Sequence, residues 1–110
     1  MAKISTAEFN GRLRRYSFDV YPIGTLFNPV GAVYVFTKRS VDALGKGTHE
    51  LLYIGETGSL ADRMPNHDKL AAVLYRGANC VCIHQDENSV SRLNKETDLR
   101  AATLTPCNEQ

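Results

Sequence analysis

The sequence predicts an α+β protein with a small, mainly antiparallel sheet of three strands flanked by helices. One observation is a set of three short runs that are rich in β-branched, aromatic or cysteine residues and contain no breaker: 31–39, 51–55 and 80–84. The other is a pair of segments with helical composition, at 68–75 and 89–103. A glycine-containing loop joins the first two strands, so we expect them to be antiparallel neighbours.

Residues 1–30 are expected to form an extension that packs on a domain spanning residues 31–110, so that the whole chain is a single domain. Within the extension, Ser5 and Glu8 have the spacing of a capping box, which predicts a short N-terminal helix. Aromatic and β-branched residues then alternate with polar ones, which predicts a strand: Tyr16, Phe18 and Val20.

After residue 55 we expect helices on both sides of the strand at 80–84. Ser59, with Asp62 three residues later, can cap a short helix. Pro65 should kink or restart that helix, because proline lacks the backbone N–H, and Gly77 is a natural stop for the next one. In the last helix, side chains at helical spacing predict the stripe that faces the core: Val90, Leu93, Thr97, Ala101 and Leu104.

Composition is that of an ordinary globular domain. The chain has 110 residues, of which 43% are hydrophobic and 23% charged. We expect no membrane contact and no signal peptide, since the longest apolar run is far shorter than a bilayer requires and the N-terminus has no apolar core. Three cysteines without a framework spacing favour a reducing, cytoplasmic location.

Charge is distributed unevenly, although the net charge of +1 does not indicate a wholly basic nucleic-acid binder. Residues 1–40 contain six Lys or Arg and two Asp or Glu, a balance of +4, whereas the remaining residues contain seven and ten, a balance of −3. The basic part includes Arg12, Arg14 and Arg15. This cluster is either a surface that contacts DNA phosphates or an ordinary solvated patch.

Several residues with catalytic chemistry occur in a characteristic order: Tyr34, Tyr53, Arg63, His67, Glu96 and Asn108. This ordered set resembles the GIY-YIG nuclease superfamily, as a small stand-alone member. Tyr53-Ile54-Gly55 matches the second motif, and Ala32-Val33-Tyr34 stands in place of the first, with a glycine one position early at Gly31. The resemblance covers about Gly31 to Asn108, and it implies the small sheet with flanking helices described above.

The resemblance implies a metal-dependent endonuclease that hydrolyses DNA phosphodiester bonds. Arg63 matches the family's arginine and suits the scissile phosphate, because its planar fork can hold two oxygens at once. Glu96 matches the metal-binding glutamate, and its carboxylate is a hard ligand suited to Mg²⁺ or Mn²⁺. A domain this small engages few base pairs, so a homodimer or a partner protein is expected for cutting both strands.

The remaining residues of the set are expected to act on water. Tyr34 and Tyr53, on adjacent strands, would position the water and the phosphate, and one of them, assisted by His67, would act as the base. The sequence leaves open which tyrosine takes that part. Asn108, which follows Pro106, is expected to shape the site near the metal.

Two departures from the family pattern favour an alternative, a catalytically weakened module that binds nucleic acid or a partner. Glu56 stands where family members often have a lysine, and Pro65 interrupts the spacing of Arg63 and His67. Simpler interpretations also exist for single residues. A strand tyrosine is often only a packing residue, and Glu96 has Arg92 and Arg100 at i−4 and i+4, where they would form helix-surface ion pairs.

A further alternative is a zinc-dependent interaction protein. Cys80, Cys82 and His84 share one face of their strand, and Cys107 lies elsewhere in the chain. Cysteines that alternate along a buried strand are, however, usually small core residues.

Overall fold

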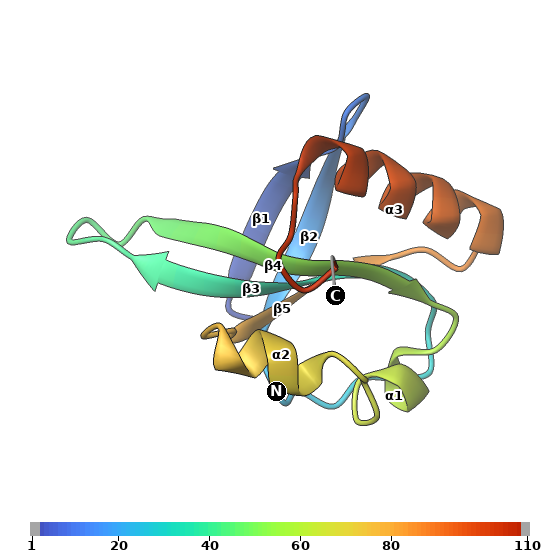
Figure 1. Cartoon of the computed structure of the whole chain (residues 1–110), viewed down its shortest axis with the longest axis horizontal. Coiled ribbons are helices and arrows are strands. Elements are labelled where there is room, and N and C mark those ends of the chain that lie inside the picture. Colours follow the sequence, from blue (N-terminus) through green and yellow to red (C-terminus); the bar gives the residue numbers. More distant parts are fainter. Residues whose placement is uncertain (1–2, 109–110) are drawn as a thin grey trace.

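The computed structural model describes residues 3–108, which form a five-stranded sheet and three short helices (Figure 1). In chain order the elements are β1 (Ser5–Asn10), β2 (Arg15–Pro22), β3 (Ala32–Val41), β4 (Gly47–Thr57), α1 (Leu60–Arg63), α2 (Leu70–Tyr75), β5 (Cys80–Gln85) and α3 (Ser89–Ala102). The strands lie in the order β1-β2-β5-β3-β4, and each neighbouring pair is antiparallel. The sheet is strongly curled, so that the β1–β2 hairpin crosses the direction of the β3–β4 hairpin (Figure 1).

The prediction of a three-stranded sheet is therefore wrong. The strands expected after residue 30 are present, and β3 and β4 are antiparallel neighbours as expected. However, β2 pairs with β5, with Val20 opposite Cys82, and β1 adds a fifth strand beyond it. Phe18 and Val20 are completely buried. A half-buried strand of this kind has to join a sheet to pair its backbone, which is why the first 30 residues supply two strands of the sheet.

The predicted N-terminal helix is also wrong, because Ser5–Asn10 is strand β1. Phe9 is buried, and its ring packs on that of Phe18 with 5.2 Å between the centroids. The capping-box spacing of Ser5 and Glu8 is not followed by apolar residues at helical spacing, and the chain turns at Gly11. Alternating burial across the β1–β2 pair thus outweighs the local helix signal.

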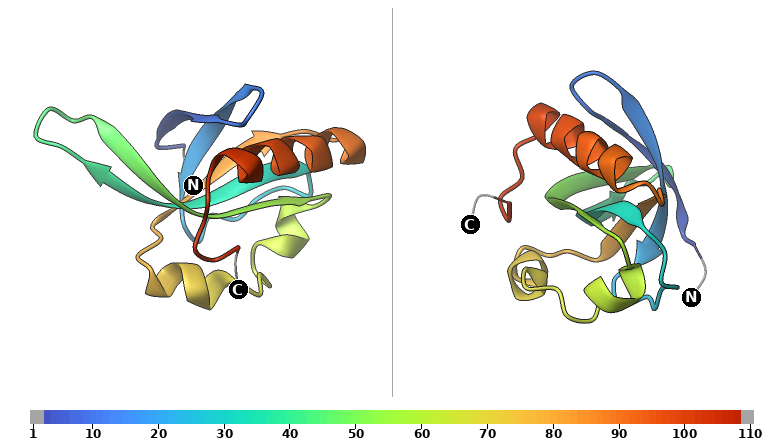
Figure 2. Two further views of the ribbon diagram at one scale, coloured as in Figure 1. Left: turned by 45° about the horizontal axis from the view of Figure 1, so that its top comes forward. Right: turned by 90° about the vertical axis from the view of Figure 1, so that its right-hand side faces the viewer.

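Helices cover both faces of the sheet, with α3 on one face and α1 and α2 on the other (Figure 2). Along β3 the side chains alternate between these faces. Val33 and Val35 join the core under α3, whereas Tyr34 and Phe36 join the core on the side of α1 and α2. Within residues 3–108, no helix is long and apolar enough to cross a bilayer.

The stripe predicted to bury α3 is wrong as well. Thr97 and Ala101 are exposed, as are the three larger members of the predicted stripe: Val90, Leu93 and Leu104. The helix instead buries Arg92 and Leu99. The physical reason lies in long-range partners, because Leu99 enters the core on this face and the Arg92 guanidinium binds Glu56 on β4.

Candidate functional site

The strand pair β3–β4 brings the two tyrosines together. Tyr34 lies opposite Gly55, and Phe36 lies opposite Tyr53. The next paired residues are Thr37 and Leu51, so Leu52 is an extra residue that forms a bulge in β4. The rings of Tyr34 and Tyr53 are stacked at 24°, with centroids 6.2 Å apart. The neighbouring-strand arrangement expected from the sequence is present.

Gly55 creates the space that the tyrosines occupy. A Cβ atom at this position would lie 2.6 Å from the Tyr34 hydroxyl oxygen and 2.8 Å from Cε1 of Tyr53. Both distances are shorter than side-chain contacts allow. The φ of Gly55 is not positive, so the glycine is required by the close approach of the rings and not by a left-handed backbone.

His67 lies edge-on to this aromatic cluster, from the segment between α1 and α2. Its ring centroid lies 5.0 Å from those of Phe36 and Tyr53 and 5.5 Å from that of Tyr34. Nε2 lies 2.7 Å from the Tyr34 hydroxyl oxygen, and Nδ1 accepts a hydrogen bond of 3.0 Å from the backbone N–H of Lys69. Since Nδ1 is an acceptor, the proton of the neutral ring is on Nε2, which donates to Tyr34.

The imidazole and the phenol are both neutral at pH 7. Burial, together with the positive charge of Arg63, lowers the pKa of His67 to about 4. Burial raises the pKa of Tyr34 well above the usual tyrosine value, although the Arg63 guanidinium acts in the opposite direction. Tyr34 is only 1% exposed, whereas Tyr53 is half-buried and its hydroxyl makes no hydrogen bond with residues 3–108.

Arg63 is the last residue of α1, and its side chain reaches the same cluster. The guanidinium interacts with the Tyr34 hydroxyl, and Nη2 donates a 2.8 Å hydrogen bond to Asp68 Oδ1. Pro65 lies in the connection between α1 and α2, so Arg63 and His67 belong to separate turns of chain and not to one continuous helix. They nevertheless meet at Tyr34.

Glu96 approaches from α3 on the other side of β4. Glu96 is half-buried, and its pKa is raised. Burial is the main cause, and the Glu56 carboxylate adds to it, whereas the positive charge of Arg100 acts in the opposite direction. Glu96 also contributes to the raised pKa of Tyr34. The charges of Glu56 and Glu96 thus act on each other, and that of Glu96 acts on Tyr34 from the α3 side of the sheet. Such hard oxygen atoms suit Mg²⁺ or Mn²⁺, which need few protein ligands.

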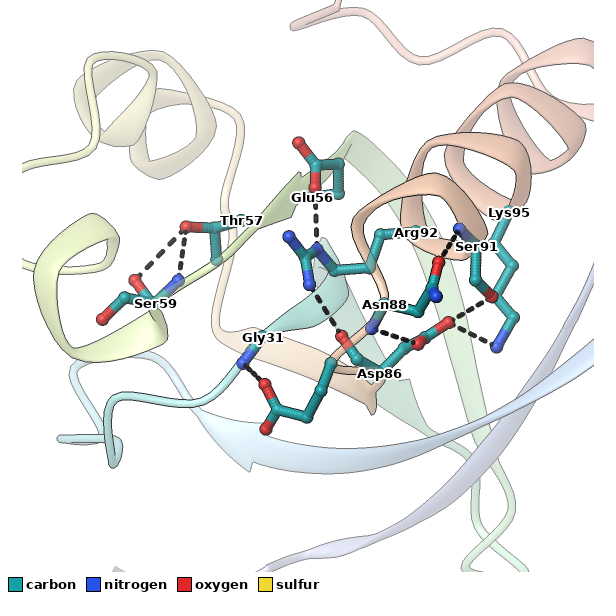
Figure 3. A network of polar contacts seen from close by, with 10 residues as sticks. Gly31, Glu56, Thr57, Ser59, Asp86, Asn88, Ser91, Arg92 and Lys95 are labelled. Atoms are coloured by element: carbon teal, nitrogen blue, oxygen red, sulfur yellow. Dashed lines mark hydrogen bonds and ion pairs between the residues drawn. The ribbon is translucent and has the colours of Figure 1, made fainter.

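The expected ion pair between Arg92 and Glu96 is replaced by a different one. Nε of Arg92 donates a 2.9 Å hydrogen bond to Glu56 Oε1, and Nη1 donates to the carbonyl oxygen of Asp86 at 3.1 Å (Figure 3). Sequence spacing did not reveal this contact, since the partners are 36 residues apart. From the sequence alone, Arg92 could equally bind Glu96, four residues later on its own helix, or a distant carboxylate such as that of Glu56.

Asn108 lies at the edge of β4, where it acts as a clamp on the backbone. Its side-chain oxygen accepts from the N–H of Ile54 at 2.7 Å, and its side-chain nitrogen donates to the Ile54 carbonyl at 2.9 Å. The neighbouring Cys107 N–H donates to the Leu52 carbonyl. The C-terminal segment thus pairs with the strand that carries Tyr53.

The basic cluster lies at the turn between β1 and β2, beside α3. Asp98 of α3 accepts hydrogen bonds from the backbone N–H groups of Leu13 and Arg14 and from the Tyr16 hydroxyl. Arg12 and Arg14 are exposed. Arg15 binds side chains of its own hairpin, Glu8 at 3.6 Å and Asn10 at 3.1 Å.

The cysteines do not form a metal site with other residues. All three are buried free thiols, and Cys80 and Cys82 belong to the core under α3. His84 binds the Ser17 carbonyl through Nδ1 and Lys95 through Nε2. Among residues 3–108, no group of three or more His, Cys, Asp or Glu is arranged to hold a metal ion.

Comparison with known proteins gives no independent assignment: no family model, no curated protein and no solved structure matches this chain.

Proposed function

We propose that the chain is a metal-dependent endonuclease of the GIY-YIG type that hydrolyses DNA phosphodiester bonds. The observation that supports it best is the convergence of Tyr34, Tyr53, Arg63 and His67 on one cluster, although they come from four separate segments. A packing role alone does not account for a buried hydroxyl that meets both an arginine and a neutral histidine. Groups with shifted pKa values that meet at one place are what a catalytic site requires.

Arg63 is the residue that would hold the scissile phosphate. Its present anionic partner, Asp68, is exposed, so exchanging that carboxylate for a phosphate would cost little free energy. A guanidinium can also form two parallel hydrogen bonds with phosphate oxygens, which fixes the orientation of the group under attack. Binding the phosphate here would place it beside the tyrosines.

Hydrolysis adds the oxygen of water to phosphorus while the bond to one ester oxygen breaks. The water loses a proton and the leaving oxygen gains one. Tyr53 is better placed than Tyr34 to contact this water, because its hydroxyl is accessible and not bound to other described residues. Tyr34 would support it indirectly, since its oxygen accepts a hydrogen bond from Nε2 of His67 and interacts with the Arg63 guanidinium.

Glu96 would hold the metal ion. Its carboxylate fits such an ion, because burial disfavours the charged form and so raises its pKa, and a cation beside it would favour the ionised form. When bound, Mg²⁺ or Mn²⁺ supplies positive charge to the phosphate oxygens and to the leaving oxygen. The same proposal includes DNA as the partner and a second copy or a partner protein for cutting both strands. It also includes a reducing cytoplasm, in keeping with the three free thiols.

The direct test is cleavage of supercoiled plasmid and of a branched oligonucleotide with Mg²⁺, with Mn²⁺ and with EDTA. The purified protein should nick DNA only with the metals, and Glu96→Ala should abolish this. Glu50→Ala, which removes a carboxylate from an exposed position on β4, should leave it unchanged. Folded protein that shifts DNA on a gel without cutting it would instead support the binding-module alternative.

A further inference from the structure

A dense polar network lies where β3 begins, β4 ends and α3 begins (Figure 3). Glu87 accepts a 2.7 Å hydrogen bond from the backbone N–H of Gly31, just before β3. Asp86 binds the side chains of Ser91 and Lys95 on α3. Arg92 then connects this corner to Glu56, near the end of β4. The network therefore fixes three elements against one another.

The Arg92 guanidinium is the centre of this network, and neighbouring residues enclose it closely. The residue is only 7% exposed. A Cβ atom at Gly31 would lie 2.5 Å from Nη1 of Arg92, so the guanidinium occupies space that only a glycine leaves open. Backbone and side chains from separate segments thus converge on one buried cation.

Stability is a weak explanation for such an arrangement. A buried ion pair gains Coulomb energy but loses the hydration of both charges, and a well-packed apolar pair is often as stable. What a fork-shaped guanidinium does supply is geometry, since its two donors bind two partners at fixed angles. Here those partners are the side chain of Glu56 and the carbonyl of Asp86.

Glu56 and Arg92 each lie close in the chain to a candidate catalytic residue. Glu56 follows Tyr53 by three positions on β4, and Glu96 follows Arg92 by four positions, or about one helical turn, on α3. Resting on the proposed nuclease function, we propose that Arg92 is a positioning residue. It fixes α3 on the end of β4 and so holds the Glu96 carboxylate at a defined distance from Tyr53. In the same contact it neutralises Glu56, which would otherwise repel the phosphate.

The decisive variant is Arg92→Lys, because lysine keeps the positive charge beside Glu56 but cannot bind both partners with a planar fork. We expect kcat for plasmid nicking to fall about tenfold or more, with KM for DNA within about threefold of the wild-type value, and the Mg²⁺ concentration for half-maximal rate to rise. Arg76→Gln, which removes an arginine charge from an exposed position at the end of α2, should change none of these values.

Charge and geometry are separated by a second pair of variants. Arg92→Gln leaves Glu56 unpaired, so KM should rise in addition to the loss of kcat. Adding Glu56→Gln to Arg92→Gln should restore KM but not kcat. If Arg92→Lys cleaves at the wild-type rate, or if Glu56→Gln restores kcat as well as KM, the positioning role is wrong. Thermal unfolding of each variant identifies any that fail to fold, and Arg92→Lys remains informative if Arg92→Gln does not.

Failure of the nuclease proposal gives a different result. If the wild-type protein cleaves no DNA with either metal, the proposed function falls, and the positioning of α3 is judged without activity. Residual dipolar couplings of the free protein report the orientation of α3 relative to β3 and β4. That orientation should change in Arg92→Lys and not in Arg76→Gln. An unchanged orientation in Arg92→Lys would overturn the structural part of the inference too.

Discussion

Replacing Gly55 by alanine tests the tightest contact in the proposed site. The added Cβ would lie 2.6 Å from the Tyr34 hydroxyl oxygen, whereas ordinary contact begins at 3.4 Å, so Tyr34 must retreat by about 0.8 Å. Tyr34 cannot retreat without disturbing its 2.7 Å contact with Nε2 of His67. Because Gly55 does not have a positive φ, the backbone itself accepts alanine, and the effect is purely steric.

The size of the effect follows from these distances. Overpacking a core by one methyl group typically costs about 1–3 kcal/mol, and each kcal/mol lowers the Tm of a domain of this size by about 4–8 °C. A displacement approaching 1 Å at a catalytic group can reduce the rate by about a hundredfold. We therefore expect Gly55→Ala to remain folded at 15 °C but to nick plasmid about a hundredfold more slowly.

The assay combines thermal unfolding with single-turnover nicking well below the Tm of each variant. Gly58→Ala is a matched control, because its added Cβ would make an ordinary 3.5 Å contact with Arg92 and its φ is not positive either. It should resemble the wild-type protein in both measurements. A Gly55→Ala protein with wild-type Tm and wild-type nicking rate would refute the close packing of Tyr34 on Gly55.

Three further outcomes are expected. Tyr53→Phe should reduce the nicking rate by about 10²-fold or more, which is the range for losing a group that takes or gives the reacting proton. Tyr34→Phe should reduce it by less, because Tyr34 is the buried partner of His67. Equal effects in single-turnover assays would contradict these assignments. His67 has a pKa of about 4 in the fold and an ordinary 6.5 when unfolded, so the unfolded chain binds more protons between these values. The protein should therefore lose stability as pH falls from about 6.5 to 4, by at most roughly 3 kcal/mol, and His67→Gln should lack this loss in urea unfolding across that range. Asn108→Ala should cost about 1–3 kcal/mol of unfolding free energy, because the Ile54 N–H and carbonyl lose their partners; an unchanged urea midpoint would show that the clamp on β4 contributes nothing.

Local sequence patterns were sufficient to predict the positions of several strands of the sheet. β3 and β5 are continuous runs of residues with high strand propensity, and their positions follow from composition alone. The tyrosine pair follows too, since neighbouring strands place Tyr34 and Tyr53 side by side. The number of strands did not follow, because pairing of β2 with β5 joins residues about 60 positions apart, and no local pattern records such a partner.

Long-range polar contacts explain the remaining differences. Arg92 looks like an ordinary helix-surface residue in the sequence, yet it is buried against Glu56, and the predicted apolar stripe of α3 faces outward. Asp98 looks like another surface carboxylate, yet it anchors the β1–β2 turn through backbone N–H groups more than 80 residues away. Helix periodicity describes which residues share a face, but it does not show which distant partners that face will meet.

The central claim is that Tyr34, Tyr53, Arg63, His67 and Glu96 form one catalytic site, and the most direct test is single-turnover nicking of supercoiled plasmid started by adding Mg²⁺. The wild-type protein should convert supercoiled plasmid to nicked circles, and Glu96→Gln, which keeps the size of the side chain but not its charge, should lose at least about a hundredfold in rate at an unchanged Tm. Nicking by Glu96→Gln at the wild-type rate, or no metal-dependent nicking by the wild-type protein, would contradict the claim.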